Sequence, residues 1–271
     1  MEINANNTEN MANFYLEIIE IQNEPETLEW KAELDPRQKS QWEQGKAILE
    51  VAPPGIDSEK MFQRFYAVAR SCQKWQAGPQ PLSEEFLKAL KALNSDQQTD
   101  LVRSLLHIDG HKATWARELS VPVELLDFIA LNTFKALLKA YGEQVSQQLN
   151  FEDWTSSHCP ICGDQPTMAK LAGKEGFRKL YCGRCETEWR YKRLGCPYCH
   201  DENASQATFL SLEDNKQYRV YLCDHCKSYI KTVDERVCGE VDLFCEDLAT
   251  KDLDHLARAE GYQRGDKRQQ V

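Results

Sequence analysis

The sequence has no long apolar run: no stretch of about 18 consecutive apolar residues occurs in the chain of 271 residues. A membrane-spanning helix needs about 20 such residues, so we predict no membrane insertion. The first residues, MEINANNTENMANFYLEI, combine neither a basic start nor a continuous apolar run, and we expect no secretory leader. The expected location is therefore the cytoplasm, where thiols are kept reduced.

Positive charge is in deficit, with 33 Lys and Arg against 43 Asp and Glu and a formal net charge of −10. Such a chain repels phosphate backbones, so we predict no nucleic-acid partner. Several enzyme motifs are missing as well: GxxxxGK followed by Ser or Thr, GxGxxG after a strand, HExxH and GxSxG. We predict that the protein is not an enzyme and has no catalytic residues.

Cysteine, in contrast, is abundant and unevenly placed. Ten of the eleven cysteines lie within residues 159–245, and eight of these form four CxxC pairs. Two thiolates three positions apart on a tight turn can supply two ligands to one tetrahedral metal ion. In a reducing compartment, clustered thiols favour metal over disulfides, so a disulfide framework is the less favoured interpretation.

Consecutive pairing of the four motifs closes shorter loops than interleaved pairing, and we therefore predict two four-cysteine metal sites. Site 1 comprises Cys159, Cys162, Cys182 and Cys185, and site 2 comprises Cys196, Cys199, Cys223 and Cys226. Interleaved pairing stays an alternative. Both predicted sites are fully coordinated, which leaves no open position for a catalytic water.

Residues beside the cysteines fit tight turns. Gly163 and Gly183 suit positions with positive φ, and His200 is expected in a similar left-handed position. Because eight cysteines complete two tetrahedra, we expect His158, His200 and His225 to lie around the sites without binding metal.

Three further cysteines are not assigned to metal. Cys72 lies on an apolar helical face, and we expect it to be a buried small hydrophobe. Cys238 and Cys245 are seven positions apart, which is too far for a CxxC-type turn, although they could share one face of a helix.

Hydrophobic periodicity predicts an all-α domain over residues 1–153. The helical segments are 36–51, 58–75, 83–93, 96–107 and 123–149. The last segment begins apolar on most of its circumference, so we expect it to run through the middle of a helical bundle.

From residue 154 the pattern changes to short strands between the CxxC pairs. Alternating, β-branched and aromatic runs cover 177–182, 187–194, 207–212 and 217–223, and helical spacing returns after residue 238. The predicted fold is α+β: the helical domain 1–153, four-cysteine modules over 154–195 and 196–237, and a C-terminal helix and tail over 238–271.

Basic residues crowd the middle of the cysteine-rich part: Arg178, Lys179, Arg184, Arg190, Lys192 and Arg193. They could offset thiolate charge, receive an acidic partner surface, or keep an edge strand solvated. The residues predicted to contact a partner are Arg184, Trp189, Arg190, Arg193 and Tyr229.

Trp154 is followed by CPICGDQP (159–166), LYCGRCETEWRYKRLGCPYC (180–199), YRVYLCDHCKSYIKTVDE (218–235) and EDLATKDLDHLARAEGYQR (246–264). Because of these segments, the last 120 or so residues resemble the formate dehydrogenase accessory proteins of the FdhE family. The helical half matches that family only in general character. The chain departs from the family pattern at His200, where CPxCG has glycine.

The resemblance implies two rubredoxin-like, or zinc-ribbon-like, modules with bound iron, zinc being the alternative metal. It also implies a cytoplasmic accessory protein that is required for active formate dehydrogenase and binds the catalytic subunit before export. Two other interpretations stay open: a rubredoxin-like electron-transfer or thiol-redox protein, and a zinc-ribbon chaperone module.

Overall fold

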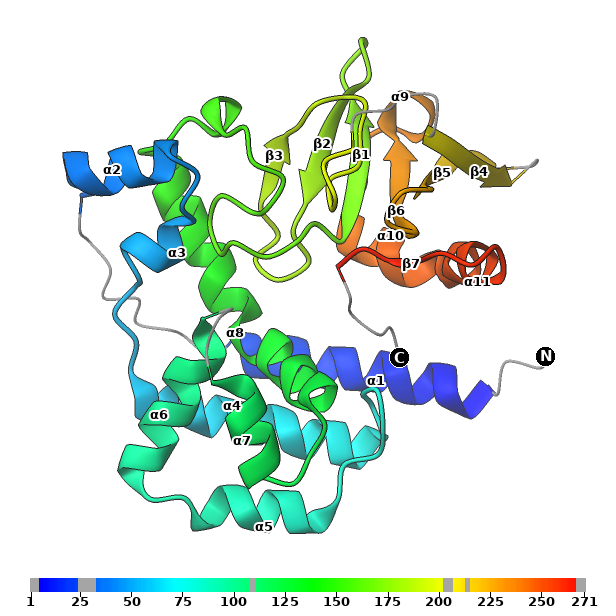
Figure 1. The fold of residues 1–271 in the computed structure, drawn as a ribbon. Helices are drawn as coiled ribbons and strands as arrows, with labels where there is room; N and C mark the ends of the chain where they lie inside the picture. The colour runs from blue at the N-terminus through cyan, green and yellow to red at the C-terminus, as the bar shows by residue number, and fades with distance from the viewer. Residues whose placement is uncertain (1–4, 24–32, 108–110, 202–206, 213–214, 267–271) are drawn as a thin grey trace. The chain divides into compact units, whose positions relative to one another are not determined.

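The computed structural model describes residues 5–23, 33–107, 111–201, 207–212 and 215–266 (Figure 1). The chain divides into two compact units. The helical unit comprises residues 1–32, 54–141 and 269–271, and the sheet unit comprises 33–53 and 142–268. None of the described helices has the length and apolar composition needed to span a membrane.

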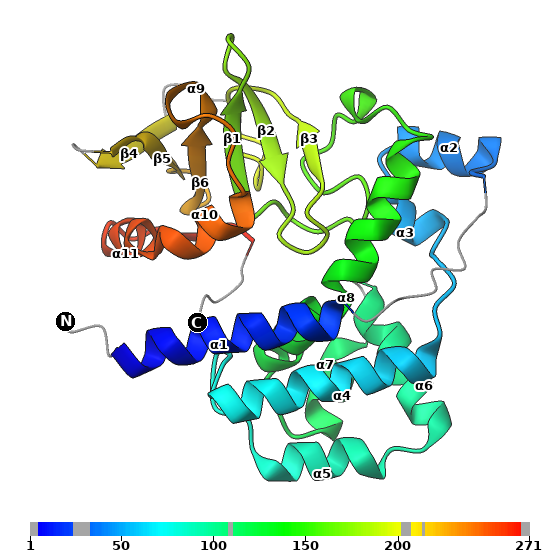
Figure 2. The same cartoon turned by 180° about the vertical axis from the view of Figure 1, so that it is seen from behind.

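The helical unit is a bundle whose helices pack around aromatic and leucine side chains. Its helices are α1 (Ala5–Gln22), α4 (Ser58–Trp75), α5 (Glu84–Ala92), α6 (Ser95–Leu106), α7 (Lys112–Glu118) and most of α8 (Val123–Ser146). Phe14, Phe65 and Phe134 are fully buried in it. Figures 1 and 2 show α1 alongside α4, and Glu17 accepts hydrogen bonds of 2.7 Å from Lys74 and Trp75.

Cys72 lies within this core, as predicted, and burial raises the pKa of its thiol to about 12. The predicted helix 36–51 is wrong in one respect, because it is two helices, α2 (Pro36–Glu43) and α3 (Ile48–Val51). Gly45 lies between them with φ of 91°, a conformation that ends the first helix. The sequence analysis did not identify α1 and α7.

The sheet unit holds seven described strands that form one sheet. They are β1 (Met168–Ala172), β2 (Phe177–Tyr181), β3 (Glu188–Arg190), β4 (Ala207–Leu212), β5 (Asn215–Cys223), β6 (Ser228–Asp234) and β7 (Gln263–Arg264). The order is β3-β2-β1-β6-β5-β4, with β7 paired to β6. β1 and β6 run parallel, with Met168 opposite Lys231, so the strands of the two predicted modules share one sheet.

Short helices of the C-terminal part cover this sheet. They are α9 (Glu235–Cys238), α10 (Leu243–Ala249) and α11 (Lys251–Ala259), and α10 and α11 meet at Thr250. Leu253 and Ala257 of α11 pack against Val220, Leu222 and Tyr229 of the sheet. The α+β class, with a C-terminal helix after two four-cysteine clusters, is confirmed.

Residues 33–53, which the sequence analysis places in the helical domain, group with the sheet unit. The physical reason is a set of hydrogen bonds to the first CxxC turn. Ile48 N and Leu49 N, at the start of α3, donate to the carbonyls of Pro160 and Ile161 at 3.0 and 2.8 Å. Trp42 Nε1 also donates to Pro160 O, at 3.2 Å. The boundaries at 154, 196 and 238 stay predictions.

Candidate metal centres

All four CxxC turns reverse the chain at the same place, the residue after the second cysteine. Gly163, Glu186, His200 and Lys227 stand there, with φ of 77°, 59°, 61° and 56°. The prediction for Gly163 and His200 is confirmed. The prediction for Gly183 is wrong, since Glu186 takes the left-handed conformation in that turn, where the chain must turn back into β3.

Backbone hydrogen bonds close the turns. Gly163 N, Glu186 N and His200 N donate to the carbonyl of the first cysteine of their pair at 3.0, 2.8 and 3.1 Å. In the same three turns, the backbone N–H of the first cysteine donates to the carbonyl five residues later, at 2.8 to 3.0 Å. These donors are Cys159, Cys182 and Cys196. Backbone hydrogen bonds therefore fix three of the four cysteine pairs, whereas the Cys223/Cys226 turn joins β5 to β6, where Cys223 pairs with Ser228.

The eight sulfurs form the two predicted groups, with all Sγ atoms of a group within 4.8 Å of one another. In site 1 Cys159 and Cys185 are 3.4 Å apart, and in site 2 Cys196 and Cys226 are 3.7 Å apart. A tetrahedron with metal–sulfur bonds of about 2.3 Å has edges of about 3.8 Å, which matches these separations. A disulfide of about 2.05 Å does not match, and none of the eleven cysteines, all of which the structure describes, is in a disulfide.

Site 1 is the drier of the two centres, because all four of its cysteines are buried. Burial raises the pKa of Cys159 and Cys182 well above the ordinary value for a thiol. Burial also acts to raise the pKa of Cys162, but the neighbouring thiols and the charge of Arg184 lower it well below that value. Four thiolates in such a place need a compensating cation, which a metal ion supplies.

Site 2 is more accessible, since Cys199 and Cys226 are half-buried. Burial raises the pKa of Cys196. Burial also acts to raise the pKa of Cys226, but hydrogen bonds from Ser228 and the neighbouring thiols lower it overall. Tyr198 N donates to Cys196 Sγ at 3.4 Å. The donor set of each site, four soft thiolates, fits zinc or iron.

Comparisons with known proteins place the two clusters in a family. Residues 158–193 match the model described as "FdhE, central domain", and residues 194–269 match "FdhE, C-terminal domain". The "Protein FdhE homolog" of Aquifex aeolicus is 25% identical over 221 residues, which cover 80% of this chain and 72% of that protein.

"Protein FdhE" of Escherichia coli K12 is 33% identical over 127 residues, which cover 46% of this chain and only 37% of that protein. The crystal structure of the FdhE protein from Pseudomonas aeruginosa has a TM-score of 0.61 at 19% identity, over 96% of this chain and 85% of that one. That likeness shows a shared fold. The chain belongs to the FdhE family.

Neither cluster of this FdhE family member includes a histidine among the described residues. His158 Nε2 hydrogen-bonds Gly45 O at 3.0 Å, and the ring packs edge-on against Trp154. His200 and His225 are exposed. Cys238 and Cys245 also lie outside both groups: Cys238 is half-buried and Cys245 is exposed.

The residues predicted to contact a partner divide into two kinds. Arg184, Trp189 and Tyr229 are buried. Trp189 Nε1 donates to Ser156 O at 3.2 Å, and Tyr229 Oη donates to Asp254 Oδ1 at 2.6 Å. Arg190 and Arg193 are exposed, so these two alone of the five present their side chains at the surface.

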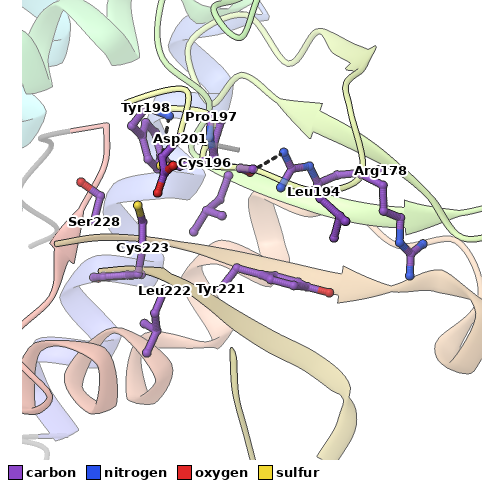
Figure 3. A pocket seen from close by; sticks show the side chains of 14 residues that line it. Arg178, Leu194, Cys196, Pro197, Tyr198, Asp201, Tyr221, Leu222, Cys223 and Ser228 are labelled. Carbon is purple, nitrogen blue, oxygen red and sulfur yellow. Dashed lines mark hydrogen bonds between the residues drawn. The ribbon is translucent and has the colours of Figure 1, made fainter. Parts of the chain in front are cut away.

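Two hollows lie near these exposed arginines in the sheet unit. A groove of about 410 Å³ is lined by Glu152, Trp154, Thr155, Phe177, Arg178, Arg190, Tyr191, Lys192 and Arg193. A pocket of about 40 Å³ lies beside site 2, where Cys196 and Cys223 form part of its wall (Figure 3). Arg178 and Arg193 line both hollows. The sequence shows the basic residues, but not that they surround a groove.

Proposed function

We propose that this FdhE family member is a cytoplasmic accessory protein required for active formate dehydrogenase, and that it binds the catalytic subunit before export. One observation supports the proposal most strongly. The residues that match the FdhE central and C-terminal domains, 158–269, include all eight clustered cysteines. In this role the protein is a binding and maturation factor and not an enzyme.

Each cluster holds one metal ion in this proposal, with Cys159, Cys162, Cys182 and Cys185 as ligands at site 1 and Cys196, Cys199, Cys223 and Cys226 at site 2. The sulfur separations and the all-thiolate donor set support it. The resemblance favours iron in rubredoxin-like modules over 154–195 and 196–237, and zinc is the alternative because it accepts the same ligands. Elemental analysis and a visible spectrum of anaerobically purified protein distinguish the two metals.

Arg190 and Arg193 make direct contact with the partner in this proposal, because both are exposed. The three buried residues contribute indirectly, because they hold the strands and the first cluster in place: Arg184, Trp189 and Tyr229. Arg184 supports this view through its attraction for Cys162. The hydrogen bond from Trp189 to Ser156 supports it as well.

A pull-down with the catalytic subunit tests the proposal. Replacing Cys182 and Cys185 by serine should remove metal from site 1 and abolish capture, while circular dichroism shows that the helical unit is folded. Arg190→Glu with Arg193→Glu should weaken capture without loss of metal. Arg258→Glu is the matched control, because Arg258 is an exposed arginine on α11.

Two results would contradict the proposal. Wild-type protein that captures no catalytic subunit refutes the binding role. Capture by a metal-free Cys182→Ser, Cys185→Ser variant at wild-type strength refutes the part given to the cysteine clusters.

An electron-transfer role is the second candidate, and the half-buried Cys199 and Cys226 favour it because electron exchange needs an approachable site. It requires iron that is reduced and reoxidised reversibly, which a spectroscopic redox titration measures. A zinc-loaded protein, or iron that does not cycle, eliminates this candidate.

A further inference from the structure

Arg178, in the middle of the sheet unit, is a buried cation without an anionic partner among its hydrogen-bond and ring contacts. It lies on β2 with 4% of its surface exposed. One terminal nitrogen donates to Gly195 O at 3.0 Å, and the guanidinium lies 5.2 Å from the ring centre of Tyr191. Its Nε has no hydrogen-bond partner among the described residues. Burial lowers the pKa of this guanidinium, which nevertheless stays charged.

A buried charge and an orphaned N–H group are both unfavourable, so an anionic ligand would stabilise Arg178. Arg178 lines the 410 Å³ groove together with Arg190, Lys192 and Arg193. Glu152 is the one carboxylate among the lining residues, and it lies 3.3 Å from Arg190. Four cations against one anion leave the groove positively charged, although the whole chain is acidic.

We propose that this groove binds an acidic segment of a protein partner, with one carboxylate of that segment paired to Arg178. This inference rests on the proposed function, which identifies the partner as a protein. The planar guanidinium matches the geometry of a carboxylate, and burial strengthens such a pair. The contact between Glu152 and Arg190 is an example of the same pair within the chain.

The layout of the groove favours several carboxylates over a single phosphate. Its cations belong to β2, the end of β3 and the residues that follow β3, so they are spread over the groove. Many phosphate sites in proteins instead gather backbone N–H groups at one point, as at a helix N-terminus or a nest. Trp154, Phe177 and Tyr191 add aromatic walls against which the methylene groups of Glu side chains can pack.

Binding of a fluorescein-labelled hexaglutamate peptide to the metal-loaded full chain, followed by fluorescence anisotropy, tests the inference. Wild-type protein should bind hexaglutamate but not hexaglutamine, and added salt should weaken binding. Arg178→Gln should lower the affinity about tenfold or more, since it removes the buried partner of a carboxylate. Arg178→Lys, which keeps the charge but not the fork, should retain part of the affinity and guards against a folding defect. Arg258→Glu should bind as wild type does.

Equal binding of hexaglutamate by wild type and Arg178→Gln overturns the inference. Inorganic phosphate should not displace the labelled peptide at concentrations where unlabelled hexaglutamate does. If it displaces the peptide equally well, the inference is overturned, because the groove would then bind free phosphate. Loss of metal from site 2 in Arg178→Gln overturns it as well, since Arg178 would then serve as counter-charge to the cluster that begins at Cys196, next to Gly195.

The pull-down separates this inference from the proposed function. Wild-type protein that captures the catalytic subunit but binds no hexaglutamate overturns the groove proposal and leaves the accessory role intact. Wild-type protein that binds hexaglutamate through Arg178 but captures no subunit supports the groove and refutes the accessory role.

Discussion

Replacing Lys231 by Met should destabilise the sheet unit more than any surface substitution in it. Lys231 lies on β6 with 1% of its surface exposed. Its Nζ is 2.7 Å from both Asp247 Oδ1 and Asp254 Oδ2, and it also donates to Asp247 O at 2.8 Å. These contacts join the centre of the sheet to α10 and α11. Arg264 on β7 reaches the same two aspartates, at 2.9 and 3.3 Å.

The size of this destabilisation follows from the aspartate charges that the substitution leaves buried. At an effective dielectric constant of about 20, each 2.7 Å contact has a gross Coulomb energy of about 6 kcal/mol. The cost of desolvating the ammonium group offsets much of that gain in the native protein. Removing one partner of a buried ion pair costs about 3–5 kcal/mol, because the other charge stays buried. Arg264 and Tyr229 still contact Asp254, so we expect the lower half of this range.

Hydrogen exchange with mass spectrometry measures the effect in each unit separately. In Lys231→Met, amides of β6, α10 and α11 should exchange about 150-fold faster or more, which corresponds to about 3 kcal/mol. Amides of α4 in the helical unit serve as the internal control and should not change. A second variant, Lys231→Met with Asp254→Asn, should recover part of the protection, because it removes the stranded charge. A loss below about 1 kcal/mol, or an equal loss in α4, would refute the reasoning.

Three further predictions concern metal, a turn residue and pH. Removing metal with a chelator should abolish the protease resistance of the sheet unit while circular dichroism keeps the signal of the helical unit; equal digestion before and after chelation would contradict this. His200→Gly should stabilise the protein by about 0.5–1 kcal/mol, because His200 has φ of 61°. Gly163→Ala, at φ of 77°, should instead destabilise it by about 1 kcal/mol. Urea unfolding measures both changes in the free energy of unfolding, and changes of the same sign would refute the argument. Burial acts to raise the pKa of Asp247, but the charges of Arg264 and Lys231 lower it overall below its ordinary 3.8. Its stabilisation is therefore present above pH 3.8 and lost as pH falls below that value, and Asp247→Asn, measured by urea unfolding from pH 6 to pH 2.5, should flatten this acid dependence.

Local patterns predicted well wherever a short segment determines its own conformation. The helix expected over 58–75 is α4, Ser58–Trp75, because Asp57 caps its first turn and the apolar spacing covers its whole length. The cysteine clusters were predictable for a related reason. Three of the CxxC turns close through backbone hydrogen bonds within six residues, and the fourth joins the neighbouring strands β5 and β6, so only the pairing of whole turns depended on the rest of the fold.

Long-range pairing was not predictable from the sequence. The parallel contact between β1 and β6 joins residues about sixty positions apart, and neither strand was expected, although β-branched residues in 228–234 are a weak signal of the second. The burial of Lys231 and Arg178 was not predictable either, because long cationic side chains are almost never fully buried unless paired. Only the tertiary structure brings Asp247 and Asp254 to Lys231, and leaves Arg178 in the wall of a groove.

The two metal centres have different relations to the rest of the sheet unit. At site 1, the carbonyls of Pro160 and Ile161 accept hydrogen bonds from α3, more than 110 positions earlier, so that turn belongs to the buried frame of the unit. Site 2 instead adjoins the groove, because Gly195, whose carbonyl holds Arg178, directly precedes Cys196. A metal ion bound by Cys196 would fix this backbone and with it the position of the guanidinium (Figure 3). A metal ion bound at site 1 would then maintain the fold, whereas a metal ion bound at site 2 would set the geometry of the surface proposed to receive the partner.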